Sequence, residues 1–134
     1  MNDQAPTRAL TVEVWLTIDA TLDNTVSNLI DDGHGVDAPV VTRARGLRER
    51  GWAVNRRHPE RGLGPVGWPP RGAMFDIPLS DDDVGYLIDL LTHGVGITRR
   101  ILAAEIHASI RQAQEQSLVL KQEALDALAE DSAR

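Results

Sequence analysis

Few residues in this chain support acid–base or metal chemistry, and their spacing does not favour an active site. The four histidines occur singly, and no two of them have the spacing of metal ligands on one helix. They are His34, His58, His93 and His107. The acidic run at residues 81–83 follows Ser80 at a predicted helix start, where the helix dipole and the N-terminal cap explain acidic residues. The absence of cysteine excludes disulfides, thiol catalysis and the usual structural zinc sites.

The glycine-rich sequence GLGPVG at residues 62–67 is a poor candidate for a phosphate-binding loop. It is not followed by a Lys-Ser/Thr pair, and it does not lie between a predicted strand and a predicted helix. The serines likewise lack the context of a nucleophile elbow. We therefore expect no enzymatic activity and no cofactor.

The arginines are the more informative charged residues, because they are concentrated in the middle of the chain. Residues 39–72 contain eight arginines and only two acidic residues, whereas the rest of the chain contains six basic and 18 acidic residues. The eight are Arg43, Arg45, Arg48, Arg50, Arg56, Arg57, Arg61 and Arg71. Either this segment pairs with acidic residues elsewhere in the fold, such as those at 31–32 and 81–83, or it binds an external anion.

The segment at residues 58–72 is the most irregular part of the chain, with four prolines and four glycines. Loops of this length inside compact domains are often functional. One hypothesis is nucleic-acid contact, with the arginines on phosphates and Trp52 or Trp68 stacked on an exposed base. The arginines in question are Arg56, Arg57, Arg61 and Arg71. The acidic pI of about 5.1 argues against this hypothesis. The alternatives are that Trp68 anchors the loop to the sheet, or that residues 68–71 form a short proline-rich docking segment.

The clearest strand pattern lies at residues 10–18, where five apolar residues alternate with polar ones. The apolar residues are Leu10, Val12, Val14, Leu16 and Ile18. This alternation predicts a half-covered strand with Val14 central in the core and Trp15 on the polar face, in an antiparallel or mixed sheet.

Helix and turn signals organise the next part of the chain. A helical pattern from Leu22 should end at Gly33, residues 38–47 fit either a strand or a helix, and residues 52–54 predict a short strand. Residues 73–79 predict another strand. A helix should start after Ser80, with Asp83 completing a capping box, and the glycines at 94 and 96 should end it within residues 92–96.

The segment at residues 97–134 has no glycine or proline and predicts one long helix. Such a helix would extend about 54 Å, whereas a compact domain of this length is about 35–40 Å across. Its apolar stripe would therefore either pack across its own domain or be covered by a second subunit. The stripe residues proposed for an oligomer interface are Ile106, Ile110, Ala113, Leu120, Ala124 and Leu128.

Together these patterns predict an α+β protein with a small mixed or antiparallel sheet, helices on one face and a long C-terminal helix. The expected organisation is a domain at residues 1–96, with its irregular loop at 58–72, and the C-terminal helix at 97–134. We expect a cytoplasmic, non-enzymatic accessory protein from a bacterium or phage that acts by protein association and forms a homodimer through the C-terminal helix. The alternative is a nucleic-acid-binding or antitoxin-like regulator that uses residues 43–71. We expect no membrane partner, since no apolar run reaches about 18 residues.

Overall fold

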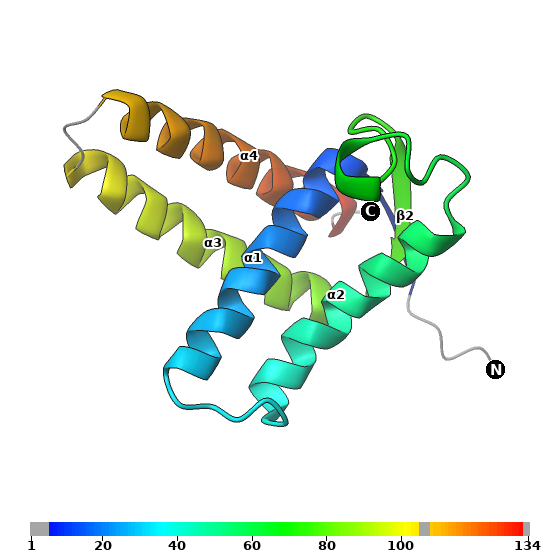
Figure 1. Cartoon of the computed structure of the whole chain (residues 1–134), viewed down its shortest axis with the longest axis horizontal. Helices are drawn as coiled ribbons and strands as arrows, with labels where there is room; N and C mark the ends of the chain where they lie inside the picture. Colours follow the sequence, from blue (N-terminus) through cyan, green and yellow to red (C-terminus); the bar gives the residue numbers. More distant parts are fainter. Residues whose placement is uncertain (1–5, 105–107, 133–134) are drawn as a thin grey trace. The chain divides into compact units, whose positions relative to one another are not determined.

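A computed structural model describes residues 6–104 and 108–132, with side chains at 6–99 and 112–130. These residues form two compact units, Met1–Ser80 and Asp81–Arg134, and each is described by itself. The elements in chain order are β1 (Thr7–Thr11), α1 (Val12–Asp31), α2 (Pro39–Arg57), the 3₁₀ turn η1 (Pro65–Gly67), β2 (Met74–Pro78), α3 (Asp81–Ala104) and α4 (Ala108–Ser132) (Figure 1). The predicted α+β class, with a small antiparallel sheet and a long C-terminal helix, is confirmed.

The sheet consists of β1 and β2, paired antiparallel with Leu10 opposite Phe75. Alternate side chains on the two strands are buried, so one face of the sheet belongs to the core and the other is exposed. The buried residues are Arg8, Leu10, Phe75 and Ile77. Arg8 is accommodated there because its Nε donates a hydrogen bond to the Leu79 carbonyl at 3.2 Å. The prediction of a strand at residues 73–79 is confirmed.

The predicted strand at residues 10–18 is wrong, because β1 ends at Thr11 and α1 begins at the next residue. Thr11 caps the helix by accepting a hydrogen bond from Val14 N. Val12, Trp15 and Ile18 are fully buried, whereas Val14 is only half-buried. The apolar pattern therefore fits a period of 3.6 as well as a period of two. The helical period prevails because it places the large Trp15 ring in the core.

Helix α2 resolves the ambiguous segment in favour of a helix and continues through residues 52–54, where the predicted short strand is wrong. It forms a hairpin with α1, which ends before Gly33 as predicted (Figure 1). Gly51 is needed for the close packing of the two helices, since a Cβ at this position would overlap the Trp15 indole.

Phe75 is the centre of an aromatic cluster that joins the sheet, α1 and the loop at residues 58–73. Its ring stacks on Trp15 at 5.9 Å and on His58 at 6.3 Å, and it meets the tilted ring of Trp68 at 5.8 Å. Trp68 is half-buried in this cluster. The loop itself is irregular, as predicted, apart from the single turn η1.

The second unit is a pair of helices, α3 and α4, which lie side by side and run in opposite directions (Figure 1). Helix α3 begins directly after the predicted cap Ser80, but the predicted break at residues 92–96 is wrong because the helix continues through it. Gly94 lies under the aliphatic stem of Lys121 on α4. Gly94 therefore does not end the helix, and an added Cβ at this position would lie at ordinary contact distance from Lys121. The prediction of one continuous helix over residues 97–134 is wrong, because residues 97–104 belong to α3 and residues 108–132 form the separate, oppositely directed α4. Residues 105–107 lie outside the described residues.

Lys121 provides a pH-dependent test of this helix pair. Its Nζ donates to Thr98 Oγ1 at 3.0 Å, and burial of the ammonium group lowers the pKa of Lys121 below its usual 10.5. The charged form therefore opposes folding at pH 7, and this opposition is lost as the pH rises through the folded-state pKa. Replacing Lys121 with methionine should raise the melting temperature at pH 7, and the gain should shrink as the pH approaches 10.5. A lower melting temperature at pH 7 would instead mean that the bond to Thr98 outweighs the burial penalty.

Candidate functional site

Helix α2 has a groove on each side, and arginines line both grooves. Arg43, Arg50 and Arg57 recur at intervals of seven residues and therefore form a stripe along one side of the helix. Arg45 and Trp52 lie on the opposite side, toward α1. Between the two sides, the buried residues of α2 pack into the core, and they are Val41, Ala44, Leu47 and Gly51.

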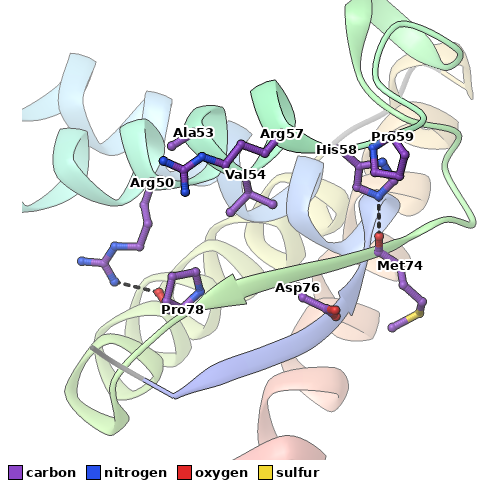
Figure 2. Close-up of a pocket in the computed structure, with 9 residues that line it drawn as sticks. All are labelled: Arg50, Ala53, Val54, Arg57, His58, Pro59, Met74, Asp76 and Pro78. Atoms are coloured by element: carbon purple, nitrogen blue, oxygen red, sulfur yellow. Dashed lines mark hydrogen bonds between the residues drawn. The ribbon is translucent and has the colours of Figure 1, made fainter. Parts of the chain in front are cut away.

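The first groove lies between α2 and β2 and has a volume of about 460 Å³. Figure 2 shows its lining, which is formed by Arg50, Ala53, Val54, Arg57, His58, Pro59, Met74, Asp76 and Pro78. Arg50 Nη1 donates to the Pro78 carbonyl at 2.9 Å, and His58 Nε2 bonds the Met74 carbonyl at 2.8 Å. These two side chains thus cover most of the outer edge of β2, as expected for a protected edge strand.

One residue of that edge remains open. Hydrogen bonds at the two ends of the sheet show that the odd-numbered residues of β2 face β1, so the even-numbered residues face the groove. Asp76 lies between the two covered carbonyls. Its backbone N–H and C=O therefore face the groove, and no residue in the described part of the chain bonds them. Asp76 thus offers one backbone donor and one backbone acceptor to a ligand in the groove.

His58 is held in a structural role. Glu60 N donates to His58 Nδ1 at 3.0 Å, so Nδ1 is an acceptor and Nε2 carries the proton that the Met74 carbonyl accepts. Both ring nitrogens are occupied by these bonds. The imidazole therefore has no nitrogen left for a metal or for transfer of a substrate proton.

Arg57 is the residue in the first groove best placed to bind an anion. Its side chain is exposed, and it has no hydrogen bond or ion pair with any described residue. In Figure 2 it extends back along α2 toward Arg50 and Ala53, above the groove. A carboxylate or phosphate group in the groove could pair with Arg57 while an apolar portion rests on Val54 and Pro59.

The second groove lies between α1 and α2 and has a volume of about 330 Å³. Its lining consists of Val26, Ile30, Val36, Arg45, Arg48, Glu49 and Trp52. The apolar residues here are unusually accessible, since Ile30 is 40% exposed, Val36 is 53% exposed and Trp52 is 38% exposed. Exposed apolar side chains that line a common groove are typical of a surface that binds another molecule.

Arg48 fixes the floor of the second groove. Its guanidinium pairs with Asp19 at 3.0 Å and with Asp23 at 2.9 Å, both on α1, and lies 4.9 Å from the centre of the Trp52 ring. Burial lowers the pKa of Arg48, but the hydrogen bond to Asp19 and the charges of both aspartates outweigh it, and the net pKa is raised. Arg48 therefore stays charged and holds Trp52 at the surface in a defined position.

The arginines predicted for anion contact are not brought together in one pocket. Arg56, Arg57, Arg61 and Arg71 are all exposed, but only Arg57 lines a groove. Trp68 packs against Phe75, which agrees with the anchoring alternative rather than with base stacking. Sequence reasoning missed the α1–α2 groove, because the pairing of Arg48 with Asp19 and Asp23 depends on which helices are neighbours. The spacing of the two aspartates by four residues was its only local sign.

The residues predicted for a C-terminal interface differ in exposure. Ala124 and Leu128 are fully buried within the single chain, Leu120 is half-buried and Ala113 is exposed. Ile106 lies outside the described residues, and Ile110 lies outside the described side chains. Val119 is the most exposed large apolar residue described on α4, at 55%. Two of the six positions are therefore already covered without a second subunit.

Neither metal-ligand clusters, membrane-spanning helices nor similar proteins point to a function for the described part of the chain. Within residues 6–104 and 108–132, no group of three or more acidic or histidine side chains could hold a metal ion. No helix in the described part of the chain is long and apolar enough to cross a bilayer. No protein-family model matches the chain, and comparisons with curated proteins and with solved structures find no match either.

Proposed function

We propose that this chain is a non-enzymatic association protein that forms a two-fold dimer through the α1–α2 groove. The observation that carries the proposal is the exposed Trp52, which Arg48 holds in place. Trp52 lines the groove together with Ile30 and Val36. Tryptophan and arginine are the residue types most enriched at the energetic centres of protein interfaces.

The charged residues at the edge of this groove favour a second copy of the chain as the binding partner. Arg45 and Glu49 lie one turn apart on α2, and neither has a hydrogen bond or ion pair with any described residue. If two α2 helices pair antiparallel across a two-fold axis that passes midway between Arg45 and Glu49 on the exposed side of α2, Arg45 of each copy lies opposite Glu49 of the other. A two-fold interface uses the same surface twice, so this arrangement gives two equivalent ion pairs beside the apolar groove.

A charge-swap series tests the proposed dimer. Arg45→Glu or Glu49→Arg alone should place like charges across the axis and reduce dimerisation, and the double variant should restore it. Sedimentation velocity at equal chain concentrations measures each mass. Val119→Glu on α4 is the matched control and should leave the dimer intact. A dimer that survives both single swaps but dissociates in Val119→Glu would place the contact on α4, as the sequence predicts.

Nucleic-acid binding is the second candidate, favoured by the exposed arginines beside the α2–β2 groove. Arg56, Arg57 and Arg61 could contact phosphates without any change in the fold, because all three side chains are exposed. The inward position of Trp68 leaves no aromatic residue of the loop free to stack on a base.

Replacing these three arginines with alanine tests this candidate. If each contacts one phosphate, the slope of log affinity against log salt should fall by about three for duplex DNA. Fluorescence anisotropy with random DNA and RNA measures the slope. An intact protein that shows no binding at low salt would exclude the candidate.

A further inference from the structure

We propose that the tip of the loop at residues 58–72 docks on an anionic lipid surface. The tip consists of Leu63, at 73% exposure, and Val66, at 96% exposure. These are the two most exposed large apolar residues among those described. This surface is separate from both grooves, so the inference does not depend on the proposed dimer.

The loop is built to hold these two side chains outward. Gly62 N donates to the Gly67 carbonyl at 3.0 Å and Gly64 N donates to the Trp68 carbonyl at 2.7 Å, which closes the loop behind the tip. A Cβ at Gly64 would overlap the Pro69 carbonyl, so only glycine fits at this crossing. Asn55 Nδ2 also donates to the Gly67 carbonyl, which ties the loop to α2.

Val66 is the strained residue of this loop. Its φ of 51° lies in the left-handed region, where a β-branched residue is unfavourable. Glycine or asparagine would fit this conformation better, yet the position carries an exposed valine that contacts nothing needed for the fold. Strain of this kind is found at functional positions, and a role for the apolar side chain at the surface accounts for it.

Arginines lie on both sides of the tip in the sequence. Arg61 precedes it and donates from Nη1 to the Arg56 carbonyl at 2.7 Å, which holds the Arg61 guanidinium near the end of α2. Arg57 and Arg71 flank the loop and are exposed. Glu60 is the only acidic residue at positions 58–72. An apolar tip between arginine-containing segments suits an anionic bilayer, because apolar side chains can enter the acyl chains while arginines contact the charged headgroups.

The chemistry of the tip favours lipid over the other classes of partner. Nucleic acid would use an aromatic residue for stacking, but Trp68 faces Phe75. A protein pocket would more often receive tryptophan, tyrosine or arginine, whereas leucine and valine are under-represented at such centres. The expectation of no membrane partner rested on the missing spanning segment, and a surface contact does not require one.

Co-sedimentation of the full chain with vesicles tests the proposal. We expect binding to phosphatidylcholine vesicles that contain phosphatidylserine, much weaker binding to pure phosphatidylcholine, and loss of binding at high salt. The double variant Leu63→Ser/Val66→Asn should reduce binding at least tenfold, a factor well below what full burial of two aliphatic side chains contributes. Asparagine tolerates the left-handed conformation, so this variant should remain folded.

Two controls make the result decisive. Val119→Ser removes an exposed valine from α4 and should leave vesicle binding unchanged. Arg61→Gln should weaken binding about fivefold while leaving the apolar tip intact. The proposal is overturned if the intact protein does not bind the anionic vesicles at low salt, or if Val119→Ser weakens binding as much as the tip variant. Binding to a protein or to RNA that depends on the tip, with no vesicle binding, would also overturn it.

Discussion

Replacing Phe75 with alanine should lower the free energy of unfolding by about 3–5 kcal/mol, the usual range for a fully buried phenylalanine. The effect should lie at the upper end of that range, because the ring contacts Trp15, His58 and Trp68 at once. Its removal would leave a cavity bordered by three rigid rings, which cannot collapse to fill it.

Urea unfolding, followed by circular dichroism, measures this loss. Met74→Ala is the matched control, because Met74 precedes Phe75 on β2 but lies on the exposed face of the sheet. It should change stability by no more than about 0.5 kcal/mol. Equal losses in the two variants would mean that the faces of β2 are assigned incorrectly.

Gly51→Ala should destabilise the protein by about 1–3 kcal/mol, although alanine is the better helix former. The added methyl group would overlap the Trp15 indole, which is fully buried and cannot move aside without displacing Phe75. Helices α1 and α2 would therefore have to separate slightly along their contact.

Gly46 gives the opposite expectation within the same helix. A Cβ at Gly46 meets no atom within 4 Å, so Gly46→Ala should stabilise the protein by about 0.5–1 kcal/mol through helix propensity and loss of chain entropy in the unfolded state. Opposite signs for the two substitutions, measured by thermal unfolding, would support the packing of Trp15 on Gly51. Stabilisation by both would contradict it.

Local turn and cap signals predicted several element ends correctly, although the predicted helix end at residues 92–96 is wrong. The end of α1 at Gly33, the start of α3 after Ser80 and the strand before it all follow from turn and cap chemistry that a few residues determine. The strand predicted at residues 10–18 was wrong because the same apolar residues satisfy both periods. Thr17 and Thr21 fit the helix interior by donating to carbonyls one turn earlier.

The binding surfaces depend on contacts between distant segments, which a single sequence does not reveal. The concentration of arginines at residues 39–72 is visible in the sequence, but the pairing of Arg48 with Asp19 and the resulting position of Trp52 required knowing that α1 and α2 are neighbours. Gly94 was predicted to end its helix, yet α3 continues through it. Gly51 allows close contact with the neighbouring helix, and that role depends on the residue opposite, Trp15.

The mass of the full-length protein in solution tests the central claim most directly. Sedimentation equilibrium at micromolar concentration should give twice the chain mass of 14.7 kDa. Trp52→Ser should shift the equilibrium toward monomer without changing the circular dichroism spectrum, because Trp52 is at the surface and outside the core. A wild-type protein that sediments at 14.7 kDa at all concentrations up to the high micromolar range would contradict the proposed dimer.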